Sequence, residues 1–250
     1  PHNTSKYREN NPLQRRVQII FEKTQCYTVL FVLIPSFLMF EILLVRPVLV
    51  DMFEMGIAKQ LMHILLSIFC FINVTGNMIM SLMTDTSLNV HINRRRCEDG
   101  SYCDKCKVHQ PARSWHCMTC NVCILRRDHH CTFLSRCIGL HNQRYYVAYL
   151  IHLCISMIYS SYYNYYFIRS KLGDYSITIS VLRLLQPFKT KHKFNPSKMK
   201  ENLVHIFGTR WYFALLWPLI DSPLPEDLCY VRHHRSKCLM SSAYLILTYL

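Results

Sequence analysis

Three stretches of the chain are almost wholly apolar, and each is close to the length that crosses a bilayer. They are Tyr27–Val45, Leu61–Met83 and Tyr146–Ile168. A helix needs about 20 apolar residues to span the hydrocarbon core, so we predict three transmembrane helices here. A carboxylate inside a span is costly unless it faces another helix or lies near the interface. For Glu41 we expect a position near a helix end.

The pattern weakens after the third stretch. Tyr175–Pro187 is too short for a span and carries Arg183 near its middle, although the basic residues beyond position 189 would require a fourth crossing. Leu203–Ile220 mixes aromatic residues with charged ones, which favours an interfacial amphipathic segment. The expected division is a cytosolic N-terminus over 1–26, two transmembrane helices with a short lumenal loop over 27–83, a cytosolic cysteine-rich domain over 84–145, a third helix with a truncated fourth over 146–188, and a cytosolic or interfacial tail over 189–250.

Composition and charge agree with a membrane protein. Hydrophobic residues make up 51% of the chain and charged residues 18%, with a formal net charge of +14. Basic residues precede the first span and follow the second as Arg94–Arg96, so positive-inside bias places both segments in the cytosol. The net charge would suit nucleic acid, but it equally suits anionic membrane lipids or a polyphosphorylated cofactor. The three apolar stretches argue against a nucleic-acid partner, and we expect none.

Cysteine usage points to metal binding. Eight of the 13 cysteines lie between positions 97 and 137. A secreted disulfide scaffold would follow a signal peptide, whereas residues 1–25 are polar and basic. Cys-x2-Cys pairs interleaved with histidines are instead typical of metal ligation in a reducing compartment.

The candidate ligands number eight, enough to fill two tetrahedral sites. They are Cys103, Cys106, His116, Cys117, Cys120, Cys123, His130 and Cys137. Zinc takes thiolate and imidazole ligands in closed four-coordinate sites, and closing short loops in this way supplies folding energy. We predict two structural Zn²⁺ ions, each held by three cysteines and one histidine. The expected fold is thus an α-helical integral membrane protein with a small cytosolic zinc-stapled domain of short β-hairpins and loops.

Cys131 remains outside this ligand set, and it follows Asp128, His129 and His130. A cysteine thiol has a pKa of about 8.5, so a neighbouring imidazole that accepts its proton raises the reactive thiolate fraction. A carboxylate can orient that imidazole, which completes a nucleophile, a base and an orienting group. Adjacent residues in an extended strand point to opposite faces, so one histidine can serve the thiol and the other a metal. The alternatives for Cys131 are a further ligand or a spare buried thiol.

The motifs between Tyr102 and Tyr146 carry a family resemblance. They are the Cys-x2-Cys pairs, Pro111, Arg113-Ser114, His116-Cys117, the Asp-His-His-Cys tetrad, Cys137-Ile138-Gly139 and Asn142. This run resembles the cysteine-rich domain of the DHHC-type protein S-acyltransferases, or palmitoyltransferases. A turn at Thr84–Ser87 and a tail containing Trp217-Pro218 extend the resemblance over most of the chain.

The resemblance implies a ligand partition and a mechanism. One zinc would be held by Cys103, Cys106, His116 and Cys123, and the other by Cys117, Cys120, His130 and Cys137. His129 would be the base and Asp128 its orienting group. Cys131 would attack the thioester carbonyl of an acyl-CoA, usually palmitoyl-CoA, and the acyl-enzyme would then pass its chain to a protein cysteine.

The same resemblance implies partners and a location. Arg126 and Arg127 beside the tetrad are candidate contacts for coenzyme A phosphates, because guanidinium groups suit phosphate oxygens, and solvated surface charge is the alternative. The other expected partners are membrane lipids and substrate proteins with cysteines near the membrane. A multi-pass protein of the Golgi or endoplasmic reticulum is expected, with the cysteine-rich domain in the cytosol.

The chain departs from the family pattern at two places. Thr132-Phe133 follows the tetrad where the family usually has Pro-Trp, and the Thr-Thr-x-Glu motif that normally follows the fourth helix is missing. Together with the short fourth span, the second departure suggests that a transmembrane segment is absent. The alternative hypothesis is therefore a catalytically impaired relative that acts as a membrane scaffold or partner subunit.

Overall fold

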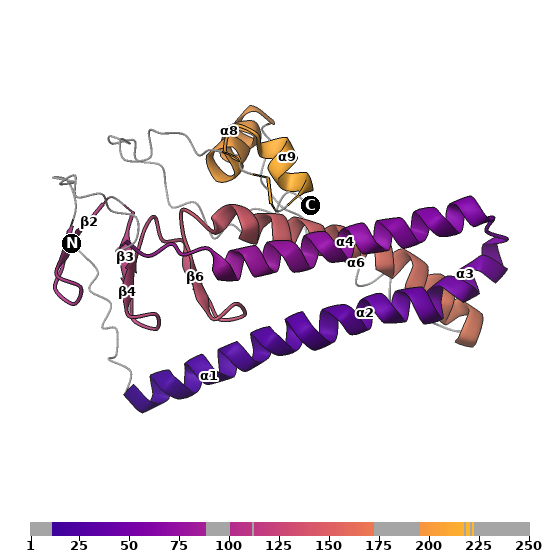
Figure 1. Cartoon of the computed structure of the whole chain (residues 1–250), viewed down its shortest axis with the longest axis horizontal. Coiled ribbons are helices and arrows are strands. Elements are labelled where there is room, and N and C mark those ends of the chain that lie inside the picture. The colour runs from indigo at the N-terminus through magenta and orange to yellow at the C-terminus, as the bar shows by residue number, and fades with distance from the viewer. Residues whose placement is uncertain are drawn as a thin grey trace. The chain divides into compact units, whose positions relative to one another are not determined.

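The computed structural model describes residues 12–88, 101–111, 113–172, 196–217, 219–220 and 222 (Figure 1). The segments Tyr175–Pro187 and Arg94–Arg96, on which the fourth span and part of the orientation argument depend, lie outside the described residues. The described residues form two compact units. One contains residues 12–32 and 85–140, and the other contains residues 33–84 and those from 141 onward.

The chain first forms a long helical path with two π-helical turns. Its segments are α1 (Pro12–Thr28), η1 (Val29–Leu33), α2 (Ile34–Phe40), η2 (Glu41–Val45) and α3 (Arg46–Phe53). Pro35 lies six residues after the first residue of η1, and Pro47 lies six residues after the first residue of η2. Proline lacks an N–H and its ring crowds the carbonyl one turn earlier, and a wider π turn relieves both problems. Neither proline therefore ends the helix.

Two described helices are long and apolar enough to cross a membrane by length and composition. They are Pro12–Phe53 and α4 (Ile57–Met83). Helix α6 (Gln143–Leu172) has 30 residues but is rich in tyrosine and serine, and it does not meet the same criterion. The third span between Tyr146 and Ile168 therefore stays a prediction.

The second unit packs α4 against α6, with α2 and α3 beside them. Glu41 is buried there and its carboxylate accepts hydrogen bonds from two α6 side chains, the hydroxyl of Ser160 and, at 3.1 Å, the amide of Asn164. The expectation that Glu41 lies near a helix end is wrong, because the helical path continues to Phe53. Its carboxyl group instead accepts hydrogen bonds from donors of a neighbouring helix, as a buried polar group requires.

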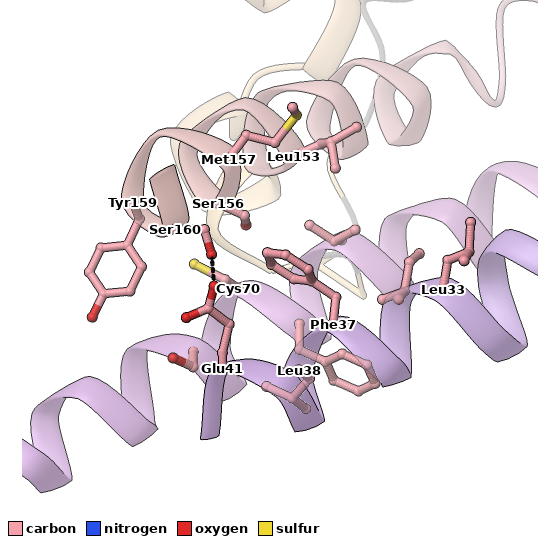
Figure 2. A pocket seen from close by; sticks show the side chains of 14 residues that line it. Leu33, Phe37, Leu38, Glu41, Cys70, Leu153, Ser156, Met157, Tyr159 and Ser160 are labelled. Carbon is pink, nitrogen blue, oxygen red and sulfur yellow. Dashed lines mark hydrogen bonds between the residues drawn. The ribbon is translucent and has the colours of Figure 1, made fainter. Parts of the chain in front are cut away.

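A cavity of about 290 Å³ lies between α2, α4 and α6 (Figure 2). Most of its wall is apolar, with Phe37, Val74 and Met157 among the side chains that line it. Glu41 and Ser160 face it at one place and are hydrogen-bonded to each other. The second unit thus contains a largely apolar cavity whose wall includes the hydrogen-bonded pair Glu41 and Ser160.

The tail adds two short helices to the second unit, α8 (Pro196–Phe207) and α9 (Trp211–Leu216). Phe207 and Ala214 are buried in one cluster with Val147 and Ala148 of α6. Gly208 ends α8 with φ 82°, a left-handed conformation that glycine adopts without a Cβ penalty. The segment that was expected to lie at the membrane interface therefore packs against the start of α6.

The first unit contains three antiparallel hairpins. They are β1–β2 (Ser101–Cys103 and Val108–Gln110), β3–β4 (Trp115–Cys117 and Val122–Ile124) and β5–β6 (His129–Cys131 and Arg136–Ile138). Corresponding strands start at positions 101, 115 and 129, so the hairpins repeat at a constant spacing of 14 residues. The turns repeat too, since Lys107, Asn121 and Ser135 have φ of 57°, 59° and 51°. The expected short hairpins are present as a tandem array.

Candidate metal centres and reactive cysteine

The eight predicted ligands come together as two groups of four. The first group is Cys103, Cys106, His116 and Cys123, and the second is Cys117, Cys120, His130 and Cys137, with the ligand atoms of each group within 4.8 Å of one another. This is the partition that the family resemblance implied. Each group could hold a metal ion.

The spacing of the ligand atoms fits a tetrahedral zinc ion. In the second group, Nδ1 of His130 lies 3.7, 3.3 and 3.6 Å from the sulfur atoms of Cys117, Cys120 and Cys137. The sulfur atoms of Cys120 and Cys137 are 3.7 Å apart. Bond lengths of about 2.3 Å to sulfur and 2.0 Å to nitrogen give tetrahedral edges of about 3.5 and 3.8 Å. The donor set and its dimensions therefore suit zinc.

Each group joins one hairpin to the next. Cys103 and Cys106 come from the first hairpin, whereas His116 and Cys123 lie on the strands of the second. The second group repeats this arrangement 14 residues later. The amide of Gln110 donates a hydrogen bond to the sulfur of Cys123 at 3.0 Å, a contact that the spacing of cysteines and histidines did not reveal. Two metal ions would thus link three hairpins in series.

The third hairpin has the same turn without a second cysteine. We call the five-residue segments 103–107, 117–121 and 131–135 the knuckle turns. Cys131 stands where the first two knuckle turns have Cys103 and Cys117, and Leu134 stands where each has its second cysteine. Leu134 is almost fully buried. Cys131 therefore occupies the first cysteine position of a knuckle turn, and an apolar side chain occupies the second cysteine position.

The backbone of the knuckle turn points amide groups at sulfur. The N–H of Cys106 lies 3.4 Å from Sγ of Cys103 in the first turn. In the third turn, the backbone amides of Leu134 and Phe133 hydrogen-bond to the sulfur of Cys131. Such donors favour a negatively charged sulfur.

The tetrad places an acid and an imidazole beside this thiol. Nδ1 of His129 lies 3.4 Å from a carboxylate oxygen of Asp128, and the backbone N–H of Asp128 donates to the carbonyl of Ile138 at 2.9 Å. Hydrogen bonds to Asp128 and then to Cys131 raise the pKa of His129 to about 9. Burial raises the pKa of the Cys131 thiol, but hydrogen bonds from His129 and the two backbone amides more than offset this, and the net pKa is lowered. The arrangement favours a thiolate paired with an imidazolium.

The predicted phosphate contacts form part of a basic cluster. The backbone N–H of Arg127 donates to the carbonyl of Arg113 at 3.0 Å, and that of Arg126 donates to the hydroxyl of Ser114 at 3.2 Å. Burial and then the nearby charge of Arg113 lower the pKa of Arg126. The guanidinium groups of Arg113 and Arg126 are therefore near enough to interact, and the backbone of Arg127 lies beside that of Arg113. Arg113 did not stand out in the sequence as a binding residue.

Comparison with known proteins identifies the family. Residues 96–220, half of the chain, match the family described as DHHC palmitoyltransferase. The chain belongs to the DHHC palmitoyltransferase family. Members of the DHHC family are membrane proteins, in agreement with the two apolar helices.

Individual relatives are also named as palmitoyltransferases. A rat protein named probable palmitoyltransferase ZDHHC24 is 28% identical over 218 residues, which cover 66% of this chain and 76% of the rat protein. Its human namesake is 39% identical over 100 residues, covering 39% of this chain and 35% of the human protein. Palmitoyltransferase PFA3 of the yeast Debaryomyces hansenii is 31% identical over 120 residues, or 48% of this chain and 25% of the yeast protein. The matched segment thus spans about a third or less of the last two DHHC proteins.

Proposed function

We propose that this protein is a protein S-acyltransferase that moves a palmitoyl-type chain from acyl-CoA to protein cysteines through a thioester on Cys131. The observation that carries the proposal is the Asp128–His129–Cys131 arrangement on a hairpin whose knuckle turn directs backbone amides at the sulfur. The family match supports the same class of reaction.

In the first half-reaction, His129 takes the proton of the Cys131 thiol. The thiolate attacks the thioester carbonyl carbon of acyl-CoA, forming a new carbon–sulfur bond as the bond to the coenzyme A sulfur breaks. Protonated His129 then returns the proton to the departing coenzyme A thiolate. The charge of Asp128 stabilises the imidazolium while it carries that proton.

In the second half-reaction the roles are reversed. His129 accepts the proton of a substrate cysteine, and the resulting thiolate attacks the acyl carbonyl on Cys131. The acyl chain moves to the substrate, and the proton returns to the sulfur of Cys131. Because members of the DHHC family are membrane proteins, we expect the substrates to be proteins with cysteines close to the membrane. We place it in the Golgi or endoplasmic reticulum, with the hairpin unit in the cytosol where acyl-CoA is present.

Other features agree with this chemistry. The apolar cavity between α2, α4 and α6 offers a surface on which an alkyl chain could be buried. The cluster of Arg113, Arg126 and Arg127 suits the phosphates of coenzyme A. The two metal ions, when bound, would cross-link the hairpins and take no part in the chemical steps.

A membrane scaffold without activity is the second candidate. The missing Thr-Thr-x-Glu motif favours it. The Asp128–His129–Cys131 arrangement favours the enzyme, because a scaffold does not require a thiol with a lowered pKa.

The test is labelling of the purified protein with a clickable analogue of palmitoyl-CoA. We expect a label on the wild type that hydroxylamine removes, as it does from a thioester, and no label on Cys131→Ser. Equal labelling of both proteins would refute Cys131 as the nucleophile. A wild-type protein that binds two zinc ions but takes no label would support the scaffold.

A further inference from the structure

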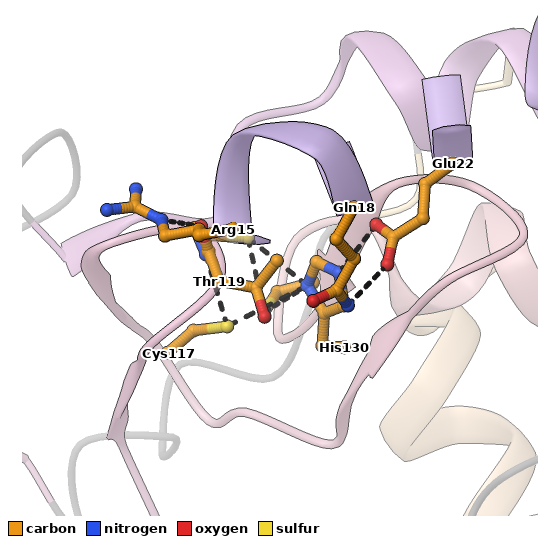
Figure 3. A network of polar contacts seen from close by, with 8 residues as sticks. Arg15, Gln18, Glu22, Cys117, Thr119 and His130 are labelled. Carbon is orange, nitrogen blue, oxygen red and sulfur yellow. Dashed lines mark hydrogen bonds and ion pairs between the residues drawn. The ribbon is translucent and has the colours of Figure 1, made fainter. Parts of the chain in front are cut away.

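A buried carboxylate of the N-terminal helix lies against the second metal group. Glu22 of α1 is 3% exposed, although it belongs to a largely exposed helix. One of its oxygens lies 3.1 Å from Nε2 of His130, and the other accepts a hydrogen bond of 2.7 Å from the amide of Gln18 (Figure 3). Removing a carboxylate from water is costly, so this position needs the two donors that it has.

This contact determines which nitrogen of His130 faces the metal group. A carboxylate oxygen can only accept, so Nε2 must carry the hydrogen, and Nδ1 then presents its lone pair to the three cysteine sulfurs. Metal-bound histidines commonly donate their second ring N–H to such an acceptor, which orients the ring and makes it a better ligand. Glu22 and His130 have this geometry.

The first metal group provides an internal comparison. Its histidine, His116, faces Cys106 through Nδ1 at 3.3 Å, as His130 faces Cys120. Among the described residues, however, the buried Nε2 of His116 has no hydrogen-bond partner. The two groups have similar ligand spacing, but only the histidine of the second group has an acceptor at its outer ring nitrogen among the described residues, whereas the first group receives the hydrogen bond from Gln110 to Cys123.

The same face of α1 holds the neighbouring hairpin. Arg15 lies seven residues before Glu22, two helical turns away, and its Nε donates to the carbonyl of Thr119 at 2.8 Å (Figure 3). Thr119 lies between the two cysteines of the second knuckle turn. Helix α1 thus contacts both hairpins that supply ligands to the second group.

We propose that Glu22 is a positioning residue for the second metal site, acting through its hydrogen bond to His130 and not merely by docking α1 on the hairpins. The inference rests on zinc occupancy of that site, which the proposed function assumes, and it does not depend on acyl transfer. Among the described residues, a residue of the N-terminal helix therefore positions the histidine of the second zinc site, and the histidine of the first site has no such partner.

The first test is the zinc affinity of the purified full-length protein, measured by competition with a chromogenic chelator. We expect Glu22→Ala to weaken one of the two sites by about 10- to 100-fold and to leave the other unchanged. Glu22→Gln keeps an acceptor oxygen in the same place and should stay within about threefold of the wild type. The exposed neighbour Lys23, changed to Gln, is the matched control on the same helix and should have no effect. Equal weakening by Glu22→Ala and Glu22→Gln would overturn the proposal.

A second test separates hydrogen bonding from helix docking. His130→Cys converts the second group to four cysteines, which bind zinc well and have no ring nitrogen for Glu22 to accept from. In this background, Glu22→Ala should cause no further loss of zinc affinity. A loss as large as in the wild-type background would show that α1 docking alone is responsible and would overturn the proposal. Failure of Cys131 labelling in a protein that still shows these zinc effects would refute the proposed function and leave the role of Glu22 intact.

Discussion

Gly139 offers the sharpest test of how tightly the hairpin unit is packed. A Cβ at this position would lie 2.6 Å from the hydroxyl of Thr86, 2.7 Å from the carbonyl oxygen of Leu125 and 2.8 Å from a methyl group of Ile124. Thr86 and Ile124 are buried, and the Leu125 carbonyl is held because it accepts the N–H of Leu140 at 3.0 Å. None of these atoms is the end of a flexible side chain, so the backbone must shift.

We expect Gly139→Ala to destabilise the unit by about 1–3 kcal/mol, the usual cost of overpacking. That is a roughly 5- to 150-fold larger opened fraction, since each 1.4 kcal/mol is a factor of ten. The melting temperature in detergent should fall by about 2–12 °C. The rate of zinc release to an excess of chelator should increase by the same factor as the opened fraction, provided that opening of the hairpin unit limits the release.

The control is Gly56→Ala. A Cβ there meets nothing within 4 Å, and φ −61° and ψ 161° are ordinary values for alanine. We expect a change below about 0.5 kcal/mol. If Gly139→Ala melts and releases zinc as the wild type does, the reasoning from packing at Gly139 is refuted.

Three further outcomes are expected from the site. Leu134→Cys should give the third knuckle turn its second cysteine. Cd²⁺ should then block labelling of Cys131 at concentrations at least tenfold below those that affect the wild type or the control Leu134→Ser. Equal sensitivity of the three proteins would contradict the correspondence of the turns. Cys106→Ser and Cys120→Ser should each reduce bound zinc from two ions to one. Cys120→Ser should reduce labelling of Cys131 more than Cys106→Ser does, because its metal group includes residues of the Cys131 hairpin. A larger loss of labelling in Cys106→Ser would contradict this expectation. Asp128→Asn should slow labelling by about 10²-fold or more at unchanged zinc content, and an unchanged rate would remove Asp128 from the mechanism.

The sequence was most informative where constraints are local. The eight ligands could be proposed because zinc binding demands particular residue types at short, regular spacing, whereas their division into two groups came from the family resemblance. The sequence spacing also places Leu134 opposite the second cysteines of the other turns, but this correspondence has meaning only because the three hairpins share one turn geometry. The start of the first helix was less visible, since α1 begins at Pro12 among polar residues that an apolar pattern does not mark.

Contacts between distant segments could not be predicted. Glu22 is 108 residues from His130, and no periodicity relates the two positions. Glu41 was expected near a helix end because an isolated pattern does not show that its donors, Ser160 and Asn164, come from a later helix. Both carboxylates are buried, and in each case their partners depend on tertiary packing and not on local sequence.

The series of hairpins also bears on how many reactive thiols such a unit can have. Each metal group takes two cysteines from the knuckle turn of one hairpin and two ligands from the strands of the next. A row of n hairpins therefore forms n − 1 such groups and leaves one turn unused, at its end. Position 144, where a fourth hairpin would need its histidine, is an arginine inside α6. Lengthening the row would therefore add metal groups and still leave one knuckle turn unused, so the proposal of a single acyl-accepting cysteine agrees with the repeat of the hairpins as well as with the chemistry.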